Sequence, residues 1–156
     1  MQTTIDAIGV VSASRTTPDD DNWGKTTSTI TLVDAIDESA LDGIESFSHV
    51  EVLFLFHAVP PEKIVAGARH PRNNPAWPKV GIFAQRGKNR PNRIGCTICR
   101  VEGRSGRSLI VSELDAIDGT PVIDIKPVMT EFLPREPTRQ PAWSTELMAN
   151  YWTEES

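Results

Sequence analysis

Four short β-rich runs follow one another between residues 80 and 128, and this succession limits the fold more than any other feature of the sequence. The runs are VGIFAQ, IGCTICRVEG, SLIVSELDAI and TPVIDIKPV, and residues typical of turns separate them. Closely spaced short strands favour a barrel or a sandwich over a layout in which strands and helices alternate. We therefore predict a mainly β fold.

The remaining segments fit one compact arrangement around these strands. We expect strands at 4–13, 28–33 and 48–59, a short helix at 37–47 and a terminal helix at 143–152. The third of these strands is so rich in β-branched and aromatic residues that burial on both of its faces is expected. Residues 59–80 are dense in Pro and basic residues and show no period, which predicts a long functional or flexible loop.

The charges are distributed very unevenly along the chain. The formal net charge is −5, yet Glu102 is the single acidic residue between Lys63 and Arg107, where basic residues are frequent. The flanks hold nearly all carboxylates, including the run Asp19 to Asp21. The basic span is suited to drawing a polyanion to one face of the protein. Ordinary pairing with the acidic flanks is the alternative.

Neither a metal centre nor a membrane segment is expected from the sequence. Cys96 and Cys99 are three apart, and this odd spacing sends their side chains to opposite faces of a strand. A zinc site would need further ligands close by, so we interpret the two as free thiols. The chain lacks an apolar run of roughly 20 residues and a signal-like start, which predicts a soluble cytoplasmic protein.

Two motifs stand apart from ordinary strand and turn vocabulary. They are GIFAQRGKNRPNRIG at 81–95 and LDAIDGTPVIDIKP at 114–127. With IGVV near the start and FSHVEVLFLFH at 47–57, their order and spacing resemble those of the TsaA/TrmO-like family. The resemblance covers roughly residues 5–130. It implies a small β-barrel with short helices and a long Pro-rich, basic loop, a single domain over 1–156 with its core at about 5–130 and a tail at 131–156.

The resemblance also implies a homodimer that binds S-adenosylmethionine, and the residues of the two motifs are chemically compatible with this ligand. Pro91 biases Arg90 toward an extended conformation, so the loop that carries Arg86 and Arg90 is stiffened. Guanidinium groups suit a carboxylate or a phosphate. Acidic groups near a turn suit ribose hydroxyls, an ammonium group or a sulfonium cation. The cofactor candidates are Trp23, Gly24, Arg86, Arg90, Asn92, Gly95, Asp115, Asp118, Gly119 and Thr120.

Each of these candidates has a structural alternative. Arg86 and Arg90 fit a plain surface hairpin, and Trp23 fits simple packing inside its loop rather than a lid over adenine. We place His57 and Asp124 near the substrate as catalytic candidates. His57 is expected on the same face of one strand as His49, where a structural histidine is the alternative, and Asp124 fits an ion pair with Lys126 equally well.

The expected activity is methyl transfer from S-adenosylmethionine, most specifically to N6 of threonylcarbamoyl-adenosine beside the anticodon of tRNA. Its RNA-binding candidates are Arg69, Arg72, Lys88 and Arg93. Two features depart from the tRNA-modifying members. The chain ends soon after the expected barrel, without the additional C-terminal domain of longer members, and its loop sequence RGKNRPN differs from theirs just before RPN. A small-molecule methyltransferase and a non-enzymatic S-adenosylmethionine-binding module therefore remain as alternatives.

Overall fold

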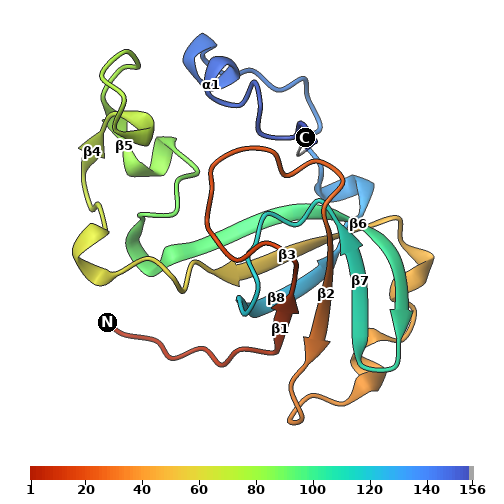
Figure 1. Ribbon diagram of the computed structural model, residues 1–156. Coiled ribbons are helices and arrows are strands. Elements are labelled where there is room, and N and C mark those ends of the chain that lie inside the picture. Colours follow the sequence, from red (N-terminus) through yellow and green to blue (C-terminus); the bar gives the residue numbers. More distant parts are fainter. Residues whose placement is uncertain (155–156) are drawn as a thin grey trace.

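A closed antiparallel barrel forms the centre of the computed structural model, which describes residues 1–154 (Figure 1). Its strands are β1 Gly9–Ser12, β2 Thr27–Leu32, β3 His49–Leu55, β6 Ile94–Ser105, β7 Ser108–Ser112 and β8 Pro121–Pro127. The order around the barrel is β1-β2-β7-β6-β3-β8, and β1 closes the circle by pairing with β8. The predicted mainly β fold and barrel are confirmed.

The inside of the barrel is filled by alternate residues of its strands. On β3, Val50, Val52 and Phe54 point into the core, whereas the residues between them are half-buried. The expected burial of this strand on both faces is therefore wrong, because only one of its faces is turned into the barrel core. Cys99 is fully buried and Cys96 is only partly so, which confirms that their side chains face opposite sides of β6.

Several elements are shorter than the sequence predicts. β1 begins only at Gly9, and β7 ends at Ser112, where Glu113 takes a φ of 63° that a continuing strand does not allow. The expected helix at 37–47 is two 3-10 turns, Glu38–Leu41 and Ile44–Ser46, because Gly43 between them has a φ of 84°. Asp37 does cap the first turn by accepting a hydrogen bond from the Ser39 amide at 2.8 Å.

The long connection between β3 and β6 is ordered by a small sheet of its own. β4 Ala68–Arg69 pairs with β5 Val80–Gly81, and 3-10 turns lie at Pro61–Lys63, Pro71–Asn73, Ile82–Ala84 and Pro91–Arg93. The buried Gln85 side chain donates to the carbonyl oxygens of Arg69 at 3.0 Å and Val80 at 2.9 Å. The prediction that VGIFAQ forms one of the main strands is thus wrong. Only Val80 and Gly81 are extended, and the chain then turns at Ile82–Ala84, which places the Gln85 side chain against these two carbonyls.

The C-terminal segment returns to the same side of the molecule as the small sheet. A 3-10 turn at Thr130–Phe132 follows β8, and helix α1 Ala142–Leu147 confirms the terminal helix, although a shorter one than expected. Figure 1 shows α1 and the β4–β5 sheet both standing clear of the barrel on one side. The Trp77 indole N–H donates to Glu146 at 3.0 Å and so connects the two.

Candidate functional site

The barrel topology gathers three connections at one end. Because neighbouring strands are antiparallel, the β1–β2 loop (13–26), the β3–β6 connection (56–93) and the β7–β8 loop (113–120) all leave from the same rim. We call this rim the loop end. Of the candidate residues, only Gly95 and Asp124 lie outside these three connections, and Gly95 is the second residue of β6 at the same rim. The fold therefore brings together residues that are about 100 positions apart in the chain.

The β7–β8 loop is pinned to the β1–β2 loop by its predicted site residues. Asp118 accepts a hydrogen bond from the Ala13 amide at 3.0 Å, and its own amide donates to the Arg15 carbonyl at 2.8 Å. Gly119 takes the turn with a φ of 79°, and Thr120 is buried with its hydroxyl on the Ile117 carbonyl at 2.7 Å. Asp118 and Gly119 stay exposed at the rim.

His57 faces this turn from the next connection. Its Nε2 lies 4.0 Å from the position that a Cβ on Gly119 would occupy. The sequence predicts His57 on the same strand as His49, and this prediction is wrong. β3 ends at Leu55, so His57 lies just beyond the strand at the loop end. His57 and the turn at Asp118–Gly119 therefore form one neighbourhood.

Asp115 is held by two hydroxyl groups from different parts of the chain. One carboxylate oxygen accepts from Thr97 on β6 and the other from the phenol of Tyr151 in the tail. Burial, the Asp115 charge and this hydrogen bond raise the pKa of Tyr151, so the phenol stays protonated and donating. Sequence reasoning missed Tyr151, because nothing in a Pro-rich tail indicates which rim it returns to.

Three arginines between residues 86 and 93 hold backbone carbonyls of the β3–β6 connection or of β6. Arg86 donates to the Cys96 carbonyl, Arg90 to Gln85 at 2.7 Å and Arg93 to Val59 at 2.8 Å. Arg90 is extended and Asn92 has a φ of 63°, as the Pro91 argument and the turn prediction require. A guanidinium carries several N–H donors, so each can hold its carbonyl and still reach a ligand.

Trp23 and Gly24 lie beneath other groups rather than over an open site. Trp23 is only 3% exposed, the Arg15 guanidinium stacks 3.7 Å above its ring, and its indole N–H donates to the Asp19 carbonyl at 3.2 Å. A Cβ on Gly24 would fall 2.1 Å from the Trp152 carbonyl oxygen. Trp23 thus packs inside its loop, which is the alternative given in the sequence analysis. A contact of Trp23 with adenine remains a prediction.

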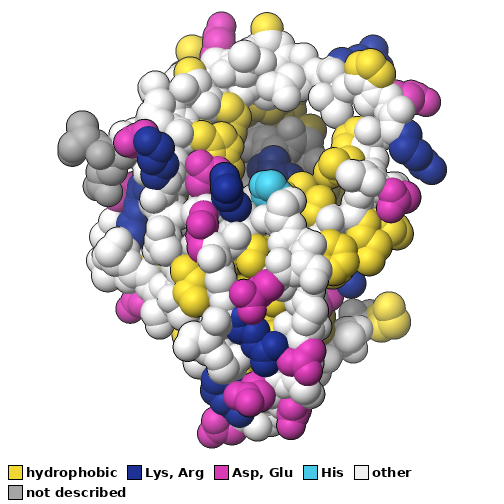
Figure 2. Space-filling model, turned by 90° about the vertical axis from the view of Figure 1, so that its right-hand side faces the viewer, with side chains coloured by type: hydrophobic (Ala, Val, Ile, Leu, Met, Phe, Trp, Pro, Cys, Tyr) yellow, Lys and Arg dark blue, Asp and Glu magenta, His cyan; other side chains and the backbone are white. Residues whose placement is uncertain are grey.

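Two of the four predicted RNA-binding residues, Arg72 and Lys88, contact the acidic flank. Arg72 makes a two-pronged contact with Asp21 at 2.9 and 3.2 Å, and Lys88 donates to the Pro18 carbonyl at 2.8 Å with Asp20 3.9 Å away. Arg69 donates to Gln85 at 3.4 Å. On the face shown in Figure 2, Lys and Arg side chains are likewise interspersed with Asp and Glu.

Asp124 lies apart from the loop end on the outer face of β8. Its carboxylate is 3.1 Å from the Lys126 ammonium, and it also accepts from the Ile125 amide at 2.9 Å. Both ion-pair partners are well exposed, so the pair adds little to stability. The ion pair that the sequence leaves open is present, and a catalytic part for Asp124 remains a prediction.

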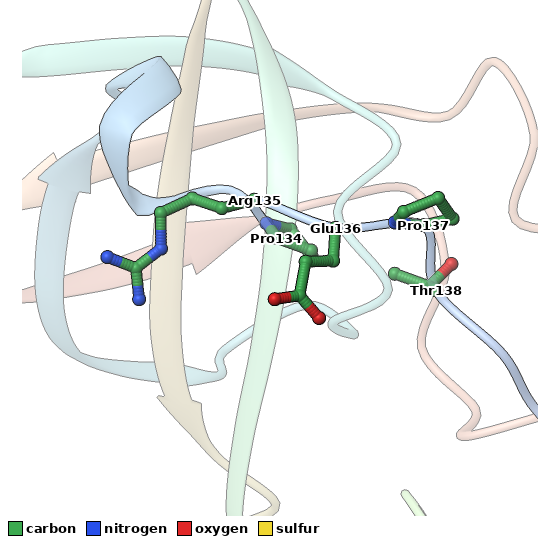
Figure 3. A pocket seen from close by; sticks show the side chains of 5 residues that line it. All are labelled: Pro134, Arg135, Glu136, Pro137 and Thr138. Carbon is green, nitrogen blue, oxygen red and sulfur yellow. The ribbon is translucent and has the colours of Figure 1, made fainter.

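Shallow hollows occur on the tail, away from these residues. They are lined by consecutive residues, 131–135 and 134–138, and Figure 3 shows the second of them. A single extended segment forms them, so they combine no groups from different loops.

Replacing Gly95 with alanine is expected to destabilise the fold. A Cβ there would fall 2.6 Å from the Phe54 ring, and overpacking of this kind costs about 1–3 kcal/mol. Gly103→Ala is the matched control, because that position on the same strand opens onto free space. Chemical denaturation measures both, and equal stability of the two variants would contradict this account of Gly95.

Cys96 is expected to be a slow nucleophile. Burial, together with the hydrogen bond to Glu51 and the Glu51 charge, raises the pKa of the Cys96 thiol to about 11 from 9.0. At pH 8 the reactive thiolate is then about 100-fold scarcer than for an unperturbed thiol, and alkylation should be roughly tenfold slower, because a thiolate of higher pKa is also more nucleophilic. Glu51→Gln should speed alkylation, and a rate matching a free cysteine in the unaltered protein would contradict the assignment.

Comparison with known proteins places the chain in a family. The model of the tRNA-methyltransferase O N-terminal domain matches residues 10–132, which is most of the predicted core. The chain belongs to this family. The crystal structure of TrmO from Pseudomonas aeruginosa superimposes with a TM-score of 0.71 at 31% identity, covering 89% of this chain and 61% of that one.

Curated relatives of the family agree with the cofactor that the sequence predicts. The human tRNA (adenine(37)-N6)-methyltransferase is 39% identical over 74% of this chain, which spans 26% of the human protein. A protein of Methanothermobacter thermautotrophicus described as a probable S-adenosyl-L-methionine-binding protein is 37% identical over 81% of this chain and 90% of its own length. The chain thus spans about a quarter of the human relative and nearly the whole archaeal one. Within residues 1–154, every helix falls short of the length and apolar character needed to cross a membrane.

Proposed function

We propose that this protein binds S-adenosylmethionine at the loop end of the barrel and transfers its methyl group to N6 of adenosine 37 in tRNA. The observation that carries the proposal is the convergence of Asp115, Asp118, Arg86 and Arg90 at one rim in a member of the tRNA-methyltransferase O family. The rim offers acidic and guanidinium groups on adjacent loops, and this donor set fits a ligand that carries an ammonium, a carboxylate and a sulfonium.

Within this proposal the residues divide into three tasks. Arg86 and Arg90 hold the carboxylate of the methionyl part, and Asp115 with the Asp118–Thr120 turn holds its ammonium or the ribose hydroxyls. When bound there, the cofactor would supply an electrophilic methyl group to the acceptor nitrogen, with the demethylated thioether as the leaving group. His57, beside the turn, takes the proton that the nitrogen loses. Asp124, the other residue predicted for this step, lies apart from the loop end and would need the acceptor to reach the outer face of β8.

The finer substrate assignment is threonylcarbamoyl-adenosine in tRNA, with the backbone phosphates of the tRNA held by Arg69, Arg72, Lys88 and Arg93. We include a homodimer and a cytoplasmic location in the proposal. Support for the dimer comes from large apolar side chains on the surface, with Phe83 78% and Ile98 46% exposed, and from the need to wall the rim off from water. Light scattering of the purified protein measures the mass that decides this point.

The activity is tested by incubating the protein with labelled S-adenosylmethionine and tRNA that either carries or lacks threonylcarbamoyl-adenosine. Label in N6-methylated nucleoside from the modified tRNA alone would support the full proposal. Two other classes of function stay in the test. Label in a metabolite extract freed of RNA would instead favour a small-molecule acceptor. The net charge of −5 supports this alternative, because an acidic protein is less suited to binding RNA. Binding with no labelled product from either source would leave a cofactor-binding module.

A further inference from the structure

The end of the described chain forms a strap across the β1–β2 loop. Residues 150–154, here called the strap, run parallel to residues 22–24. The amides of Asn22, Trp23 and Gly24 donate to the carbonyls of Asn150, Tyr151 and Thr153 at 3.0, 2.8 and 3.1 Å. The strap is thus held along its length by backbone hydrogen bonds, and its close approach requires a glycine at position 24.

This docking delivers one polar group to the loop end. The Tyr151 phenol reaches Asp115 and, with the Thr97 hydroxyl on the other oxygen, fixes the direction of the carboxylate. The positive charges of Arg86 and Arg72 partly oppose the rise of the Tyr151 pKa. Tyr151 therefore joins the β1–β2 loop, through its backbone bond to Trp23, to Asp115 in the β7–β8 loop.

We propose that Tyr151 is a positioning residue for Asp115 in the cofactor site, and that docking of the strap is coupled to binding of S-adenosylmethionine. The inference rests on the proposed function and adds a segment to its site. Because the strap orients Asp115 for the ligand, the ligand in turn stabilises the docked strap, as thermodynamic linkage requires. Binding should then slow hydrogen exchange of the Asn22, Trp23 and Gly24 amides, whose acceptors belong to the strap.

The decisive variant is Tyr151→Phe, which removes the hydroxyl and keeps the ring. Loss of a hydrogen bond to a carboxylate predicts about tenfold weaker binding of S-adenosylmethionine by calorimetry. Thr130→Val is the matched control, because its hydroxyl also donates to a carboxylate, that of Glu131 at 2.6 Å, but lies in the turn after β8 and outside the strap. We expect binding by this control within about twofold of the unaltered protein.

A double-mutant cycle separates positioning from general support of the fold. In an Asp115→Asn background the Tyr151→Phe change should cost clearly less than in the unaltered protein, because its charged acceptor is gone. Gly24→Ala, which forces the strap away from the β1–β2 loop, should reproduce the tenfold loss and abolish the ligand-induced protection of the three amides. Melting temperatures establish that each variant is folded.

The outcomes distinguish a failure of the role of Tyr151 from a failure of the proposed function. Binding by Tyr151→Phe that equals the unaltered protein, or identical effects of this change in both backgrounds, would overturn the inference and leave the proposed function intact. Absence of binding by the unaltered, folded protein would overturn both.

Discussion

Asp118→Ala is expected to weaken binding of S-adenosylmethionine by roughly 10- to 100-fold. Hydrogen bonds to charged groups contribute about 1.5–3 kcal/mol, and the Asp118 carboxylate holds the Ala13 amide while its exposed edge faces the rim. The substitution therefore removes a ligand group and also releases the β7–β8 loop from the β1–β2 loop. Calorimetric titration measures the change in affinity.

Two companion variants separate these effects. Asp118→Asn keeps an oxygen for the Ala13 amide but lacks the charge. If this variant also binds weakly, the charge of Asp118 contributes to binding the ligand. Asp42→Ala removes a carboxylate of similar exposure at the opposite end of the barrel, where it pairs with Arg104 at 2.7 Å, and should bind normally. Unchanged affinity in Asp118→Ala would contradict the placement of the cofactor at this turn.

Replacing Asp20 and Asp21 together with asparagine is expected to raise the affinity for tRNA several-fold at low salt. Both carboxylates pair with Arg72, and that of Asp20 also lies 3.9 Å from the Lys88 ammonium, so their removal frees both cations for phosphates. Each added phosphate contact steepens the dependence of log affinity on log salt by about 0.7–0.9. Filter binding across a salt series measures affinity and slope together.

The control for this variant removes the cations instead of the acids. Arg69→Ala with Arg72→Ala should weaken tRNA binding and flatten its salt dependence, since two phosphate contacts are lost. If the Asp20/Asp21 variant bound tRNA no better than the unaltered protein, the acidic run would not be competing with RNA, and the basic residues would serve the fold alone.

The sequence predicts the framework of this protein well, for a clear physical reason. β2, β6, β7 and β8 arise from runs of β-branched residues between turn residues, and such runs have few other ways to bury their apolar faces. The extended Arg90 and the turn at Asn92 follow from Pro91 because these preferences are local. Local chemistry was sufficient at these positions.

The sequence predicts less where partners are distant in the chain. The docking of Tyr151 on Asp115 and the pairing of Arg72 with Asp21 join segments whose meeting depends on barrel closure, and the clamp made by Gln85 depends on the pairing of β4 with β5. The strand expected from VGIFAQ fails for the same reason, because a buried glutamine that serves two carbonyls outside the barrel decides its course. Such contacts leave no periodic trace in the residues that make them.

Calorimetric titration of the purified protein, freed of carried-over ligand, with S-adenosylmethionine tests the central claim most directly. The account predicts saturable binding that Arg90→Ala and Asp118→Ala both weaken while the fold, checked by its melting temperature, persists. No heat of binding from the folded protein, or binding that neither change affects, would contradict a cofactor site at the loop end of the barrel.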